Sequence, residues 1–121
     1  MNYSMLELAF IGDAIHTAFI RNYLIKNNQF KLDILHKNAS KFCSAKFQSK
    51  VLDSIIALLS EEESDIVRRA RNTKTKHIAK NACTADYHKA TSFEALIGWL
   101  YLNNQKERLN EILNLSILKE E

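Results

Sequence analysis

The sequence predicts an all-α protein, a bundle of five or six helices that form one domain over residues 1–121. The chain of 121 residues contains no proline and only two glycines, whereas sheets built from hairpins need frequent turn residues. Apolar residues recur at helical spacing along most of the chain, and a chain of this length can bury one hydrophobic core.

The first expected helix covers about 4–26. Its apolar side chains fall on more than one helical face, so we expect a buried central helix. A second helical region follows at about 33–59. We expect it to divide into two helices, because its middle, 38–41, is a weak helix former.

Capping boxes, in which a Ser, Thr or Asn stands three residues before a Glu, mark the starts of three further helices. The three pairs are Ser60 with Glu63, Thr91 with Glu94, and Asn104 with Glu107. They predict helices over about 60–72, 92–102 and 104–118. The segment 73–90 lacks helical periodicity, and we expect a long basic loop there, a kind of loop that is often functional.

The net charge of +3 is mild, but its distribution along the chain is uneven. Residues 61–65 are acidic, whereas 68–80 contain six Lys and Arg residues and no acid. A block of one sign is most often a solvated face, but a basic block is also the footprint of a polyanionic partner.

The two cysteines, Cys43 and Cys83, are too few for a disulfide framework and lack zinc-ligand spacing. We therefore expect a reduced, cytoplasmic protein. No apolar segment reaches the roughly 18 residues that span a bilayer, and no leader pattern occurs at the N-terminus. We expect neither membrane insertion nor secretion.

Asp13 is the first candidate functional residue, because it is the only charge in the apolar run 8–15. An aspartate in a helix usually lies on the solvent-facing side, but few polar residues lie on the same side of the helix as Asp13. A carboxylate in apolar surroundings must be paired, neutralised or bound to a metal. Gly12 beside it costs about 1 kcal/mol relative to alanine in mid-helix, which the close approach of another helix or a ligand would explain.

Glu94 is the second candidate. A capping box with Thr91 could by itself explain why a glutamate occurs at this position. However, Glu94 also directly precedes the apolar run 95–101, which contains Gly98. If the two helices cross near their glycines, Asp13 and Glu94 could share a hard cation such as Mg²⁺.

Two runs resemble the catalytic domains of the ribonuclease III family: LAFIGDA at 8–14 resembles the signature helix, and FEALIGWLY at 93–101 resembles the second catalytic helix. Three blocks between them resemble the narrower Mini-ribonuclease III family, which lacks the double-stranded-RNA-binding domain: LHK at 35–37, SAK at 44–46 and RRARNTK at 68–74. The blocks occur in order over about 6–115. Larger ribonucleases III have further acids where this chain has Ala9 and Thr91, so the number of metal ions stays open.

The resemblance implies a homodimer that hydrolyses double-stranded RNA with Mg²⁺, for which Mn²⁺ could substitute, and leaves 5′-phosphate and 3′-hydroxyl ends. It also implies a role in maturing precursor ribosomal RNA of the large subunit. It assigns Asp13 and Glu94 as catalytic metal-binding carboxylates. We expect Asp13 to hold the ion that generates the nucleophile and Glu94 to complete its site. His16, one turn after Asp13, is a candidate for an orienting hydrogen bond.

Duplex RNA is recognised mainly by its shape and its phosphates, so we expect basic residues to bind it. The candidates are Lys46, Arg68, Arg71, Lys74, Lys76 and Lys80, with Lys50 in reserve. The arginines at 68, 69 and 71 cannot all point one way on a helix, so we expect at least one of them in a salt bridge instead.

Two other classes of protein stay open from the sequence. A non-catalytic RNA-binding or ribosome-associated helical adaptor would keep Asp13 and Glu94 as buried structural groups. A helix-turn-helix DNA binder would fit the 60–80 region only superficially, because its basic residues continue into the expected loop and do not line a recognition helix.

Overall fold

The computed structural model describes residues 2–27, 31–73 and 84–117, and these residues form helices with no strand among them. The elements are α1 (Met5–Asn27), α2 (Leu32–Phe42), α3 (Ala45–Ile55), the short 3₁₀ helix η1 (Ile56–Leu58), α4 (Glu61–Arg71), α5 (Thr84–Leu102) and α6 (Lys106–Ile117). The predicted all-α class is confirmed. None of the described helices combines the length and the apolar character needed to cross a membrane.

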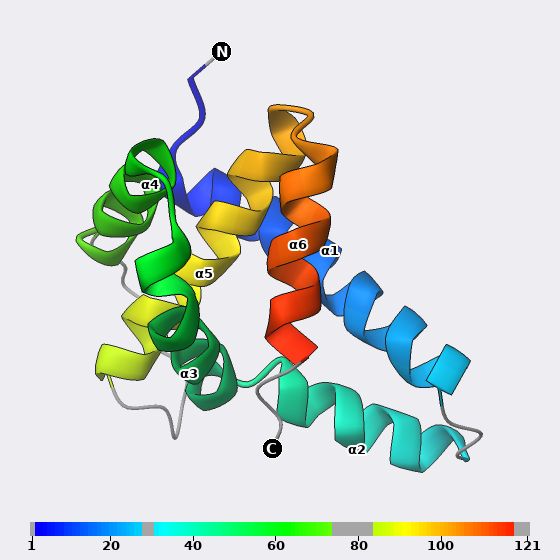
Figure 1. Cartoon of the computed structure of the whole chain (residues 1–121). Coiled ribbons are helices and arrows are strands. Elements are labelled where there is room, and N and C mark those ends of the chain that lie inside the picture. The colour runs from blue at the N-terminus through cyan, green and yellow to red at the C-terminus, as the bar shows by residue number, and fades with distance from the viewer. Residues whose placement is uncertain (1, 28–30, 74–83, 118–121) are drawn as a thin grey trace.

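Helix α5 is the centre of the bundle. It contacts α1, α3, α4 and α6, and Figure 1 shows these helices arranged around it. Its buried residues lie on all sides of the helix: Ala90, Thr91, Ser92, Phe93, Ala95, Leu96, Ile97, Gly98 and Leu100. A helix with apolar residues on every side is buried by the helices around it, and α5 is therefore the central helix of the bundle.

Helix α1, predicted to be the buried centre, has one exposed face, so that prediction is wrong. It packs against α5, but Phe10 is 83% exposed and Leu6 is 42% exposed. Apolar residues give a helix the same periodicity whether the rest of the chain buries them or leaves them exposed. The periodicity therefore could not show that α5, and not α1, is the buried central helix.

The second helical region divides into α2 and α3, as predicted. The break lies at Cys43 and Ser44, slightly after the predicted weak centre. The Ser44 hydroxyl accepts a hydrogen bond from the Phe47 backbone N–H at 3.2 Å and donates to the Lys41 carbonyl at 2.9 Å. One side chain thereby ends α2 and begins α3.

The capping box at the start of α4 is confirmed. The Ser60 hydroxyl accepts from the Glu63 backbone N–H at 3.1 Å, and the Glu63 carboxylate accepts from the Ser60 backbone N–H at 2.8 Å. Glu63 is only 3% exposed, and Arg108 of α6 donates to both of its oxygens at 2.8 Å. This pair ties α4 to α6, and the hydrogen bonds from Arg108 hold the pKa of Glu63 below its usual range.

The other two predicted capping boxes are wrong. Thr91 lies inside α5, where its hydroxyl donates to the Tyr87 carbonyl at 3.0 Å. Asn104 ends α5 in the left-handed conformation, with φ 57°. The next backbone N–H, of Gln105, donates to the Leu100 carbonyl at 3.0 Å, as in a Schellman motif. Asn104 therefore closes one helix and does not open the next.

The expected loop over 73–90 is also partly wrong, because 84–90 belong to α5. Residues 74–83 lie outside the described part of the chain. The first turns of α5 are held by tertiary contact with α3, including an ion pair of 3.0 Å between Lys89 and Asp53. Tertiary contacts of this kind override weak local periodicity.

Candidate metal and RNA-binding site

Helices α1 and α5 cross with their backbones in contact. A Cβ atom on Gly12 would lie 1.7 Å from the Glu94 carbonyl oxygen, and a Cβ atom on Gly98 would lie 1.9 Å from the Leu8 carbonyl oxygen. Only hydrogen fits at either position. The two helices therefore cross at their glycines, which is the condition named above for a shared cation, and the crossing places Asp13 beside Glu94.

The carboxyl groups of Asp13 and Glu94 interact directly. Burial, the charge of Asp13 and a side-chain hydrogen bond with Asp13, in that order, raise the pKa of Glu94 to about 8. Among the described residues neither acid has an ion-pair partner. A hydrogen bond between two carboxyl groups requires that one of them keeps its proton, and a cation bound between them would take the place of that proton.

The expectation that Asp13 lies in apolar surroundings is wrong, because its side chain is exposed. Its apolar neighbours on that face of α1, such as Phe10 and Ala14, are exposed as well. Glu94 is only partly exposed and lies behind it on α5. The pair thus has an open side and a covered side.

Two buried polar side chains stand behind the acids. Gln48 of α3 is 2% exposed and His16 of α1 is 1% exposed. The Gln48 Nε2 atom lies 3.1 Å from His16 Nδ1 and 3.5 Å from Glu94 Oε2. Burial lowers the pKa of His16 to about 4, so the imidazole is neutral at physiological pH. His16 therefore has an orienting hydrogen bond, and its partner is Gln48.

The donor set fits a hydrated magnesium ion. The described residues contain no group of three or more His, Cys, Asp and Glu side chains that could hold a metal. The candidate site therefore has the two acids Asp13 and Glu94. Ala9 and Thr91, where larger relatives carry acids, contribute no carboxylate. Two carboxylates suffice for Mg²⁺, which binds oxygen and retains several water molecules.

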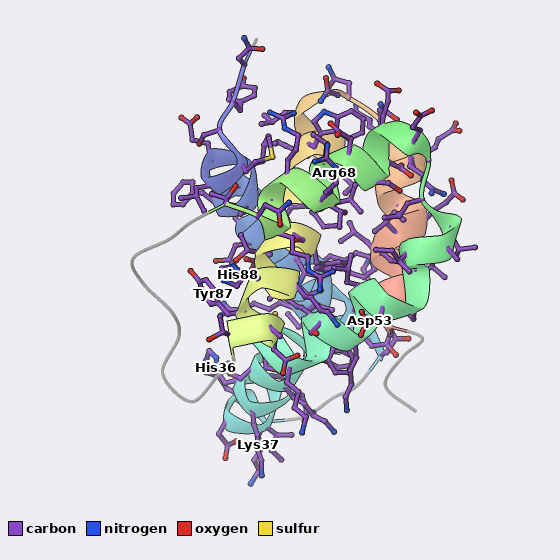
Figure 2. The ribbon with its side chains drawn as sticks, turned by 90° about the vertical axis from the view of Figure 1, so that its left-hand side faces the viewer. His36, Lys37, Asp53, Arg68, Tyr87 and His88 are labelled. Atoms are coloured by element: carbon purple, nitrogen blue, oxygen red, sulfur yellow. The ribbon has the colours of Figure 1, made fainter. Side chains whose placement is uncertain are left out.

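The predicted RNA-binding residues that the structure describes are exposed. Lys46 lies in the first turn of α3, and Arg68 and Arg71 lie on α4. Arg68 forms a salt bridge with Asp65, and Arg69 lies 3.9 Å from the same carboxylate, which confirms the expected salt bridge. In Figure 2 Arg68 lies far from Lys37 of α2, so the basic side chains are spread over several helices. Lys74, Lys76 and Lys80 fall outside the described residues.

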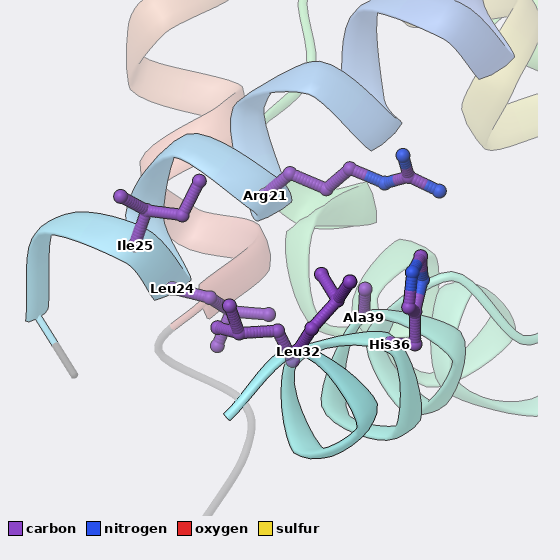
Figure 3. Close-up of a pocket in the computed structure, with 7 residues that line it drawn as sticks. Arg21, Leu24, Ile25, Leu32, His36 and Ala39 are labelled. Atoms are coloured by element: carbon purple, nitrogen blue, oxygen red, sulfur yellow. The ribbon is translucent and has the colours of Figure 1, made fainter. Parts of the chain in front are cut away.

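A separate pocket of about 150 Å³ lies between α1 and α2. Figure 3 shows Arg21, Leu24, Leu32 and His36 among the residues that line it. None of the predicted site residues lines this pocket, so it is distinct from the pair of acids.

Gln48 is the site residue that the sequence analysis missed, although the sequence holds a signal for it. Val51, Leu52 and Ile55 follow it at spacings of three, four and seven, and all are buried. These spacings place Gln48 on the core-facing side of α3. A polar residue in a core-facing row is a reason to look for a polar partner.

Comparisons with known proteins show which family the chain is similar to. Residues 6–105 match the family model for the ribonuclease III domain. The chain is 44% identical to a protein named Mini-ribonuclease 3 from Enterococcus faecalis, over 94% of this chain and 88% of that protein. It is 48% identical to a Mini-ribonuclease 3 from Clostridium tetani, over 93% of this chain and 75% of that protein. A crystal structure of a Fusobacterium nucleatum protein superimposes with a TM-score of 0.89 at 38% identity, covering 99% of this chain and 96% of that one.

Proposed function

Because the chain belongs to the ribonuclease III domain family, in its Mini-ribonuclease 3 branch, we propose that it is a magnesium-dependent endoribonuclease that hydrolyses double-stranded RNA. The observation that supports this proposal most directly is the contact between Asp13 and Glu94 at the α1–α5 crossing. A purely structural role, as in a non-catalytic adaptor, would gain nothing from two adjacent acids without an ion-pair partner among the described residues.

Asp13 and Glu94 would hold the cation, with waters and the substrate phosphate completing its coordination. A bound Mg²⁺ supplies an activated water and neutralises charge on the phosphoryl group and the leaving oxygen. Asp13 is exposed in the single chain, so a cation can reach it without a change in fold. His16 is buried and neutral, which suits it to accept a hydrogen bond and not to act as an acid. The products carry 5′-phosphate and 3′-hydroxyl ends.

The exposed basic residues bind the phosphates of the duplex: Lys46, Arg68, Arg71 and, outside the described residues, Lys74, Lys76 and Lys80. The salt bridge between Arg68 and Asp65 is exposed at both side chains, and such pairs are worth only about 0–1 kcal/mol. A phosphate can therefore compete for Arg68. Replacing one phosphate-binding residue should reduce the slope of log affinity against log salt by roughly 1.

The exposed apolar face of α1 supports a homodimer. Leu6, Phe10 and Ala14 follow one another at intervals of four residues, and all three side chains are exposed. A phenylalanine that is 83% exposed leaves a large apolar area in contact with water unless a partner covers it. Two copies joined here would give two active sites, one for each strand of the duplex.

The substrate in the cell is precursor ribosomal RNA of the large subunit, and this role places the enzyme in the cytoplasm. Transcribed precursor of the large-subunit RNA, incubated with the purified protein, tests this step. Cleavage at a defined pair of positions supports the assignment, and scattered cleavage equal to that of an unrelated duplex contradicts it.

Nuclease activity is tested with purified protein, a long RNA duplex and Mg²⁺. The wild-type protein should cut the duplex, and Asp13→Asn should leave it intact while keeping the fold. Asp33→Asn, which removes an exposed acid in the first turn of α2, is the matched control and should cut normally. Intact RNA with the wild-type protein at several salt concentrations would refute the proposed activity, and duplex binding without cleavage would favour the adaptor.

A further inference from the structure

Gln48 is a buried amide among apolar core residues. It is 2% exposed, and on the same face of α3 Val51 and Leu52 are each 1% exposed. An amide withdrawn from water needs hydrogen bonds to offset its lost hydration. Its partners come from two other helices: His16 of α1 and Glu94 of α5.

Hydrogen bonding fixes the orientation of this amide. Its –NH₂ group carries two hydrogens, and its nitrogen lies 3.1 Å from His16 Nδ1 and 3.5 Å from Glu94 Oε2. The reversed amide would set its carbonyl oxygen against the Glu94 carboxylate, with an acceptor facing an acceptor. The nitrogen therefore donates to both neighbours, and the proton of the neutral His16 ring is on Nε2.

His16 is itself held rigidly. It is 1% exposed, and its ring meets the ring of Phe93 edge to face with centroids 5.1 Å apart. Phe93 is the residue just before Glu94 on α5. The ring that anchors Gln48 is thus packed against the same turn of helix that carries the metal-binding acid.

We propose that Gln48, anchored by His16, is a positioning residue that holds the Glu94 carboxylate in the orientation that binds the cation. This inference rests on the metal site proposed above. Glu94 has three rotatable side-chain bonds, and fixing them in one orientation costs conformational entropy. The hydrogen bond from Gln48 offsets this entropy cost before the ion binds. The bond strengthens when the carboxylate is ionised, and it uses only one of the acceptor positions on the two oxygens.

The experiment measures Mn²⁺ binding, so it does not depend on cleavage. Bound Mn²⁺ is counted by the loss of the free-ion electron paramagnetic resonance signal, for wild-type protein and for Gln48→Met. Methionine has a similar length and no N–H, and outer groups of this kind typically change metal affinity about 10- to 100-fold. We expect Gln48→Met to bind Mn²⁺ about 10-fold or more weakly, and its cleavage defect to shrink as the Mn²⁺ concentration rises.

Two further variants separate positioning from damage to the core. Val51→Ala removes buried volume one turn along α3 without touching the amide, and it should lower thermal stability while leaving Mn²⁺ affinity unchanged. His16→Phe removes the anchor, and it should weaken Mn²⁺ binding by itself but add little to Gln48→Met in the double variant. If Gln48→Met does not fold, His16→Phe carries the test alone.

Each remaining outcome overturns a stated part of the reasoning. Equal Mn²⁺ affinity in wild-type protein and Gln48→Met overturns the positioning role alone. An equal loss of affinity in Val51→Ala and Gln48→Met does the same, because the effect is then one of general packing. If the wild-type protein binds no Mn²⁺, the metal site is overturned and the positioning role with it. If it binds Mn²⁺ through Asp13 but cuts no duplex, only the proposed activity fails.

Discussion

The substitution Gly12→Ala tests the helix crossing on which the candidate site depends. In an exposed helix this change would stabilise the protein by about 1 kcal/mol through helix propensity. Here the added methyl group would lie 1.7 Å from the carbonyl oxygen of Glu94, whereas ordinary contact begins at 3.4 Å. The obstacle is the backbone of α5, so no side-chain rotation can relieve the overlap, and the helices must separate by more than 1 Å.

The magnitude follows from these two opposing effects. An extra methylene in a core lined by side chains costs about 1–3 kcal/mol, so we expect at least about 3 kcal/mol where both surfaces are backbone. After the gain in propensity, the net loss is at least about 2 kcal/mol. For a domain of this length, roughly 4 °C is lost per kcal/mol, which gives a melting temperature lower by roughly 8 °C.

Thermal unfolding in metal-free buffer, followed by far-ultraviolet circular dichroism, measures the change. Ala18→Gly on the exposed face of α1 is the matched control, because it changes helix propensity alone and should cost about 1 kcal/mol. Gly98→Ala, whose methyl group would lie 1.9 Å from the Leu8 carbonyl oxygen, should behave like Gly12→Ala. A Gly12→Ala protein that melts at or above the wild-type temperature would falsify the close crossing.

Three further outcomes follow from the structure. In metal-free protein the pKa of Glu94 is raised from 4.5 to about 8, so the folded state binds more protons between these values and unfolding experiments should show stability falling as pH rises through this range. Glu94→Gln should flatten that dependence, and an unchanged slope would contradict the shift. Phe10→Glu should convert a dimer to a folded monomer in light scattering, whereas a monomeric wild-type protein would contradict the proposed interface. Arg108→Met should cost about 3 kcal/mol in chemical denaturation, because the buried Glu63 loses its partner, and a loss below about 1 kcal/mol would show that Glu63 is hydrated.

Local sequence determined the helical class and several of its boundaries. The absence of proline, the scarcity of glycine and the Ser60 capping box act within a few residues, so they can be recognised without a structure. The same is true of the two glycines that flank the acids, since a glycine in mid-helix indicates a close approach even when the approaching partner is unknown. Asp13 and Glu94 became candidates because each is an acid in or beside an apolar run, and the family resemblance supplied their expected role.

Tertiary structure decided what these residues contact. The periodicity of α1 and α5 is alike, but only α5 is covered on all sides, because burial depends on the helices that surround each one. Thr91 satisfies a capping pattern but lies inside α5, because contacts with α3 extend α5 toward its N-terminus. Asn104 satisfies the same pattern but closes α5 in the left-handed conformation. Gln48 and His16 are far apart in sequence, so no local pattern could pair them. Only the packing of α1, α3 and α5 brings one amide within reach of both the histidine and Glu94.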